Sequence, residues 1–149
     1  LVSLSRNIFF YKKLQLKDNF ESRIILIFIH FSIILIIFKS KNREKFPQLI
    51  FDNIFQNIEY HLRELGHGDV SVNKKMKILT KIFYDILIKL SEKQTNLKIN
   101  QKLLDKYFEI PINELQKREK FALYLNNFYK FCFELPTKNM IEDLKNFKF

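Results

Sequence analysis

The chain has 149 residues, enough for one domain with a sizeable hydrophobic core, and its 47% of apolar residues exclude a disordered tail. Its formal net charge of +10 would ordinarily indicate nucleic acid or an anionic membrane surface as a partner. That inference is weakened because Ile, Lys, Asn and Phe, which have AT-rich codons, dominate the sequence and the lysines are scattered over every predicted helix.

Two helices are expected before residue 40. Residues 6–14 (RNIFFYKKL) predict a short helix, and Asp18 or Asn19 in the turn after it would cap the next one. Residues 24–38 (IILIFIHFSIILIIF) form the most apolar run of the chain. As a helix this run reaches about 22 Å, short of the roughly 30 Å of a bilayer core, so we expect a buried helix in preference to a short or interfacial membrane segment. A strand is disfavoured because the run is long for one.

A single histidine, His30, lies inside this apolar run. We expect a core histidine that is hydrogen-bonded to a neighbour. The alternative is a metal or haem ligand, but the other histidines, His61 and His67, do not lie at metal-ligand spacing from it. The single cysteine, Cys132, excludes an internal disulfide and a Cys-rich zinc site, and its apolar neighbours indicate a core position.

The middle of the chain predicts two amphipathic helices. After a polar linker (KSKNREKF), Pro47 suits the first turn of a helix that runs to Leu65, and a second helix spans residues 74–90, followed by a loop at 93–99. The apolar stripe of the first helix comprises Phe51, Ile54, Phe55, Ile58, Leu62 and Leu65. The inward positions of the second are Leu79, Ile82, Phe83, Ile86, Leu87 and Leu90.

Three further helices are expected towards the C-terminus. They are residues 101–109, which Pro111 ends or restarts, residues 113–133, and a last short helix capped by Pro136 and Thr137. Their inward residues are Leu103, Leu104, Tyr107 and Phe108, then Leu115, Phe121, Leu125, Phe128 and Cys132, then Ile141, Leu144 and Phe147. No strand pattern and no internal repeat is visible, so the sequence predicts one all-α domain over residues 1–149, an irregular bundle of six to seven helices.

The only two glycines of the chain, Gly66 and Gly68, stand two residues apart. Gly66 directly follows Leu65 and suits a left-handed residue that ends a helix. Gly68 and Asp69 then supply a tight turn in which glycine again tolerates positive φ, and Ser71 or Asn73 would cap the next helix. The stretch LGHGDVSVN therefore predicts a compact corner between two helices.

Charges of both signs surround this corner. They are Asp52, Glu59, Arg63, Glu64, Asp69, Lys74 and Lys75. They form either a solvated network, the usual fate of surface charges, or a recognition surface on which Arg63 and the lysines meet an acidic partner. The residues alone leave both alternatives open.

The stretch from residue 49 to 77 resembles the signature of the ubiquinol–cytochrome c chaperone family, assembly factors of respiratory complex III. The matching positions are Phe51, Asp52, Phe55, Leu62, Arg63, Glu64, Gly66, Gly68, Asp69, Val72, Lys74, Lys75 and Lys77. Phe83 and Tyr84 continue the resemblance, but Asp85 and Ile86 stand where the family has glycine and arginine. The apolar helix with its internal histidine also resembles the family, which argues against a membrane span. The family carries more helix ahead of residue 9, so we expect that part of the first helix is missing.

The resemblance implies an all-α protein without enzymatic activity or cofactor. Its implied partner is newly made cytochrome b, joined by a second assembly factor and the ribosome, at the cytoplasmic face of a bacterial inner membrane or the matrix face of the mitochondrial one. The residues it assigns to partner binding are Asp52, Arg63, Glu64, Gly66, Gly68, Asp69, Lys74 and Lys75.

The competing interpretations are a basic α-helical nucleic-acid binder and a small membrane-anchored interaction protein. An enzyme is disfavoured because no nucleophile with its base, phosphate loop or metal cluster is visible.

Overall fold

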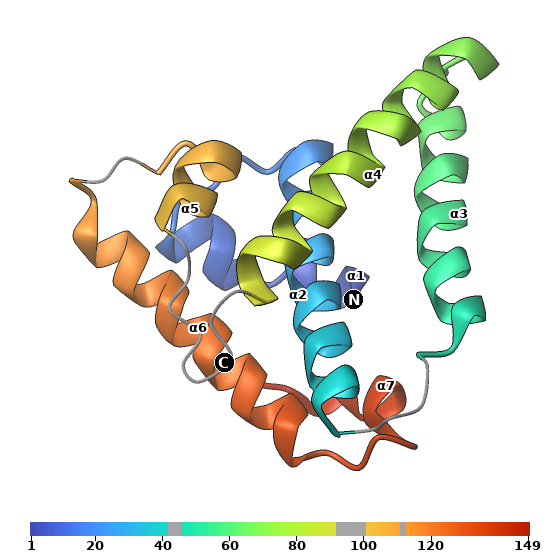
Figure 1. Ribbon diagram of the computed structural model, residues 1–149. Coiled ribbons are helices and arrows are strands. Elements are labelled where there is room, and N and C mark those ends of the chain that lie inside the picture. Colours follow the sequence, from blue (N-terminus) through green and yellow to red (C-terminus); the bar gives the residue numbers. More distant parts are fainter. Residues whose placement is uncertain (42–45, 92–100, 111–112) are drawn as a thin grey trace.

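A computed structural model of the chain describes residues 1–41, 46–91, 101–110 and 113–149 (Figure 1). Within these ranges the chain forms seven α-helices and no strand, which confirms the predicted all-α bundle. The helices are α1 (Val2–Ser5), α2 (Phe20–Lys41), α3 (Gln48–Glu64), α4 (Asp69–Ser91), α5 (Gln101–Phe108), α6 (Leu115–Glu134) and α7 (Met140–Asp143). A π-helical turn (Phe9–Lys13) follows α1, and a 3-10 turn (Leu144–Asn146) follows α7.

Helix α2 is the centre of the bundle. It contacts α1, α4, α5 and α6, while α3 packs against α4 (Figure 1). Every residue of α2 from Ile24 to Ile34 is buried, because neighbours cover the helix on all sides. The prediction of a buried helix is thus confirmed, although α2 has 22 residues and is long and apolar enough to cross a membrane by length and composition alone.

The N-terminal helix differs from the predicted one. Residues 6–14, predicted to form a short helix, contain only the π-helical turn, and α1 precedes them. The side-chain oxygen of Asn7 accepts the backbone N–H of Phe9 at 2.9 Å, which interrupts the helical hydrogen bonds between them. Of the two cap candidates for α2, Asn19 is correct, because its Oδ1 accepts the N–H of Ser22 at 2.8 Å.

The C-terminal helices follow the predicted order with local corrections. Leu115, predicted to face inward, is 60% exposed at the start of α6. Arg118 is buried in its place, and its guanidinium bonds to the Asp105 carboxylate and the Ile110 carbonyl, so α6 is tied to the end of α5. The cap of α7 is Asn139 and not Pro136 with Thr137, because the Pro136 carbonyl accepts the N–H of Asn139 in the turn before the helix.

Two predicted features fall outside the described residues. They are the loop at residues 93–99 and the helix break at Pro111. The first residues of the predicted linker, 39–41, belong to α2. Its middle, residues 42–45, also lies outside the described residues. Pro47 directly precedes the first helical residue of α3, and its carbonyl accepts the N–H of Ile50 at 3.1 Å.

The buried histidine has two partners, as predicted for a core residue. His30 Nδ1 lies 2.6 Å from the Leu26 carbonyl, and Nε2 lies 2.9 Å from the Tyr124 hydroxyl on α6. Burial lowers the pKa of His30 to about 4, although the hydrogen bond to Leu26 acts in the opposite direction. Among the described residues no group of three His, Cys, Asp or Glu side chains could hold a metal ion. Cys132 is also buried, and burial raises the pKa of its thiol to about 12.

Candidate functional site

The corner between α3 and α4 begins at Gly66, which has a φ of +87° as predicted. Its N–H bonds to the Arg63 carbonyl at 2.9 Å, and the N–H of His67 bonds to the Leu62 carbonyl at 3.3 Å. These two bonds form a Schellman motif, in which a left-handed residue lets the chain turn back and bond the last carbonyls of a helix. Gly66 therefore ends α3 and sets the direction in which the chain leaves it.

The second glycine has a different role from the predicted one. Gly66 is the one glycine with positive φ, so Gly68 needs no left-handed conformation. The carbonyl of Gly68 accepts the N–H of Val72 at 2.9 Å, which makes Gly68 the residue that opens α4. Helix α4 thus begins at Asp69, five residues before the predicted start, and Ser71 and Asn73 lie within the helix and do not cap it.

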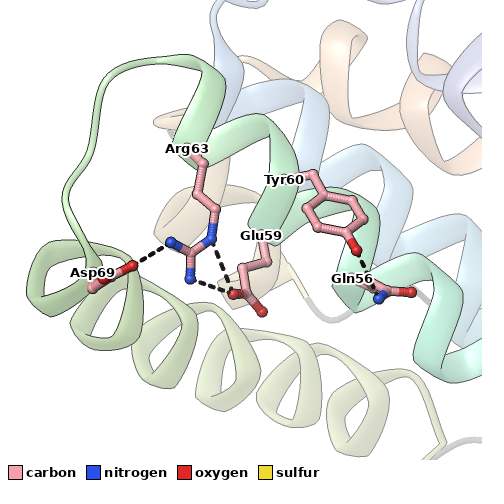
Figure 2. A network of polar contacts seen from close by, with 5 residues as sticks. All are labelled: Gln56, Glu59, Tyr60, Arg63 and Asp69. Atoms are coloured by element: carbon pink, nitrogen blue, oxygen red, sulfur yellow. Dashed lines mark hydrogen bonds and ion pairs between the residues drawn. The ribbon is translucent and has the colours of Figure 1, made fainter.

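Arg63 joins the two helices across the corner (Figure 2). Its Nη1 donates to Oδ1 of Asp69 in the first turn of α4, and its Nε and Nη2 donate to Oε1 of Glu59 one turn earlier in α3, at 3.3 and 2.8 Å. The carboxylate of Asp69 also lies near the free amides at the start of α4, where negative charge is favourable. These hydrogen bonds raise the pKa of the Arg63 guanidinium and hold it in one orientation.

The exposed face of α3 carries a row of polar contacts that leads to this network. Gln48 donates to Asp52, four residues later, at 2.7 Å. Gln56 donates to the Tyr60 hydroxyl at 3.0 Å with the same spacing (Figure 2). Asp52 therefore shares a face with Arg63, but three helical turns separate them, so the structure does not bring Asp52 into the corner. The sequence analysis missed Gln56 and Tyr60, although their spacing of four residues is the signal for such a pair.

The remaining predicted residues occupy different sides of the corner. Glu64 pairs with His61 at 3.3 Å and does not contact Arg63. Lys74 is exposed and Lys75 is half-buried, and neither forms an ion pair within the described part of the chain. The structure thus brings together Arg63, Gly66, Gly68 and Asp69, adds Glu59, and places Lys74 and Lys75 on the next turn of α4.

Leu65 does not belong to the buried stripe of α3, contrary to the prediction. It is 54% exposed because the helix ends one residue earlier and the chain turns away. It borders a cavity of about 450 Å³ between the N-terminal segment, the start of α2 and α3. The walls of this cavity include Val2, Arg6, Ile24, Ile58, His61 and Leu65.

Asp85, one of the two positions that depart from the resemblance, has a structural role. Its carboxylate accepts hydrogen bonds from Lys89 at 2.7 Å and from Lys106 and Tyr107 of α5. Partial burial raises the pKa of Asp85, but the donors from Lys89, Tyr107 and Lys106 outweigh it and hold the pKa well below its usual value. Asp85 thus links α4 to α5 as an ionised carboxylate.

Chemically, the corner is suited to binding. It presents a guanidinium held by two carboxylates, and two lysines that form no ion pair with the described residues, an arrangement typical of surfaces that recognise charged or hydrogen-bonding groups. The comparisons with known proteins agree with a binding role. Residues 12–97 match the family model described as Ubiquinol-cytochrome C chaperone, and this range includes α2, α3, the corner and α4. The searches of curated proteins and of solved structures found no match.

Proposed function

Because the chain belongs to the ubiquinol–cytochrome c chaperone family, we propose that it is an assembly chaperone of ubiquinol–cytochrome c reductase and acts by binding, without catalysis. The observation that carries the proposal is the family match over more than half of the chain, with the corner inside the matched range. The finer proposal is that the client is newly made cytochrome b, held at the cytoplasmic face of a bacterial inner membrane or the matrix face of a mitochondrial one. A second assembly factor and the ribosome complete the proposed set of partners.

The corner is the proposed contact for this client. Arg63 has five N–H groups, and its bonds to Glu59 and Asp69 within the described residues use three of them. The remaining donors sit on a guanidinium whose orientation is already fixed, so a partner's carbonyl or carboxylate oxygen binds with little loss of side-chain entropy. Lys74 and Lys75 add positive charge on the next turn of α4. Glu64 and Asp52 add acidic groups on the α3 side.

Burial of α2 supports peripheral attachment in place of a membrane span. Inserting this helix into a bilayer would separate it from α4, α5 and α6 and expose the core residues that cover it. The hydrophobic side chains of those helices would then face water, at about 25 cal/mol for each Å² of apolar surface.

The test is a reduced-minus-oxidised absorbance spectrum of membranes from cells that lack the protein, with quinol–cytochrome c reductase activity measured alongside. We expect loss of the b-type haem signal of complex III, which the intact gene restores and the Arg63→Ala/Asp69→Ala variant does not. Arg23→Ala/Asp18→Ala is the matched control, because it removes an exposed Arg–Asp pair at the start of α2. An unchanged spectrum in the deletion strain would refute the chaperone function, and full rescue by the Arg63/Asp69 variant would refute the corner as its site.

A further inference from the structure

The outward face of α4 carries a stripe that no neighbouring helix covers. Successive side chains of a helix are rotated by about 100° around its axis, and those of this stripe all point within about 40° of one direction perpendicular to the axis. We call it the lysine stripe, and it consists of Val70, Lys74, Lys77, Lys81, Tyr84 and Ile88. The buried residues of α4 point the opposite way, against the core, and they are Val72, Phe83, Ile86 and Leu90. The helix is about 34 Å long, so the stripe forms a straight, narrow surface.

Apolar side chains stand at both ends of the lysine stripe and are strongly exposed. Val70 is 85% exposed at one end, and Tyr84 and Ile88 are 48% and 57% exposed at the other. Ile78, at the edge of the stripe, is 50% exposed. Single exposed apolar residues are ordinary on a protein surface, but three in one stripe of one helix, with Ile78 beside it, indicate a surface that is covered in use.

The centre of the stripe is positively charged, and no acidic side chain among the described residues neutralises it. Lys74, Lys77 and Lys81 are exposed, and none of them forms an ion pair with the residues that the structure describes. Both acidic residues of α4 are engaged elsewhere, since Asp69 pairs with Arg63 and Asp85 bonds to Lys89 and to α5. The stripe therefore presents three ammonium groups to the solvent with no carboxylate among them.

We propose that the lysine stripe docks α4 lengthwise on an anionic lipid surface. The ammonium groups would lie against lipid phosphates, with their aliphatic stems over the headgroup layer, while Val70, Tyr84 and Ile88 enter the boundary with the acyl chains. The biological role of this contact rests on the function proposed above, because it would hold the chaperone at the membrane that contains its client. The contact itself is a property of the isolated protein.

Two features favour a lipid surface over other anionic partners. Lysine is depleted in the cores of protein–protein interfaces, where Arg and clustered aromatic residues supply the binding energy, and the stripe has neither an Arg nor an aromatic cluster. Duplex nucleic acid would engage the lysines through phosphates, but it offers nothing apolar to cover Val70 and Ile88. A lipid surface offers phosphates to the lysines and an apolar layer to Val70 and Ile88.

The experiment is flotation of the purified full chain with vesicles of phosphatidylcholine alone and of phosphatidylcholine mixed with phosphatidylglycerol. We expect binding to the mixed vesicles that weakens as salt is added, and at least tenfold weaker binding by Lys77→Glu/Lys81→Glu, since each lysine near such a surface contributes about 1 kcal/mol. The matched control is Lys12→Glu/Lys13→Glu, which makes the same change in net charge on the exposed π-helical turn. Val70→Asn/Ile88→Asn should reduce the part of the binding that survives high salt.

Three results would overturn the proposal. They are equal binding to both kinds of vesicle, equal weakening by the two charge-reversal variants, and binding to random duplex DNA that is tighter than binding to the mixed vesicles. Circular dichroism confirms that each variant is folded, and Lys77→Gln/Lys81→Gln provides a milder variant that tests the same prediction. The membrane spectrum described above remains independent, so failed vesicle binding with an intact requirement for complex III would remove the lipid contact and leave the chaperone function standing.

Discussion

His30 of α2 and Tyr124 of α6, 94 residues apart in sequence, meet in the core with 2.9 Å between Nε2 and the hydroxyl oxygen. The Leu26 carbonyl can only accept a hydrogen bond, so Nδ1 of His30 must carry the proton that is donated to it. Nε2 of the neutral ring is then an acceptor, and Tyr124 donates to it. This bond specifies one register between two helices whose surrounding contacts are almost entirely apolar.

Removing the tyrosine hydroxyl should destabilise the fold. Tyr124→Phe leaves Nε2 of His30 buried without a donor, and we expect the free energy of unfolding to fall by about 1 to 3 kcal/mol. Urea denaturation followed by circular dichroism measures the change. Tyr129→Phe is the control, because Tyr129 is half-buried on α6 and has no hydroxyl hydrogen bond within the described residues. A similar loss for both variants would contradict the specific role of the His30–Tyr124 bond.

Stability should also depend on pH through His30. Its folded-state pKa of about 4 lies below the unfolded value of about 6.5, so the unfolded chain binds more protons between these values. The contribution of neutral His30 to the free energy of unfolding is therefore fully present above about pH 6.5. It is lost as the pH drops towards 4, which lowers the free energy of unfolding by about 3 kcal/mol in total. His30→Gln removes this titration, and its stability should change less over the same interval. Parallel curves for the two proteins would show that His30 does not titrate with a depressed pKa.

The two glycines should respond differently to substitution. Gly66→Ala places a side chain at a φ of +87°, which costs about 1 to 2 kcal/mol even though the space around the new Cβ is open. Gly68→Ser should change the stability little, because Gly68 has no positive φ, no atom lies within 4 Å of its added Cβ, and serine is a good residue to open a helix. Thermal denaturation of the two variants compares them directly. Equal destabilisation would place Gly68 in a conformation that only glycine adopts.

Asp85 should couple α4 to α5 energetically. Asp85→Asn weakens the hydrogen bonds from Lys89, Lys106 and Tyr107, and we expect a loss of about 1 kcal/mol. Tyr107→Phe removes one donor from the same carboxylate, so a double-mutant cycle should give a coupling energy of about 1 kcal/mol. Additive effects of the two substitutions would mean that the contact contributes nothing to stability. Because the carboxylate is ionised, its contribution is present at neutral pH and is lost in strong acid, where the low pKa is finally reached.

Sequence reasoning located most of the fold because the buried face of a helix repeats every three or four residues. Ile58, Leu62, Phe83 and Ile86 were placed correctly from this spacing alone. The same spacing failed at helix ends, where Leu65 and Leu115 continue a pattern but have no neighbour to cover them.

The remaining errors concern contacts between distant segments. The start of α4 at Asp69 depends on the Gly68 carbonyl and on Arg63 of another helix, and no apolar repeat marks it. Arg118 is buried because Asp105 and Ile110 of the preceding segment supply its partners, which its own sequence neighbourhood does not reveal. Local turn chemistry at Gly66 predicted the corner between α3 and α4, whereas the partner-binding residues followed from the family resemblance. The separation of Asp52 from the corner follows already from the predicted helix between Pro47 and Leu65, because eleven residues of a helix span about three turns.

The central position of α2 also has a consequence for synthesis on the ribosome. The helix is translated before α4, α5 and α6, which cover it. Until Tyr124 has left the ribosome, Nε2 of His30 lacks the hydroxyl that donates to it, and the apolar surface of α2 is only partly covered. During that interval the nascent chain presents a segment with the length and hydrophobicity of a membrane span. The surface of α2 can therefore be fully covered only after α6 has been synthesised.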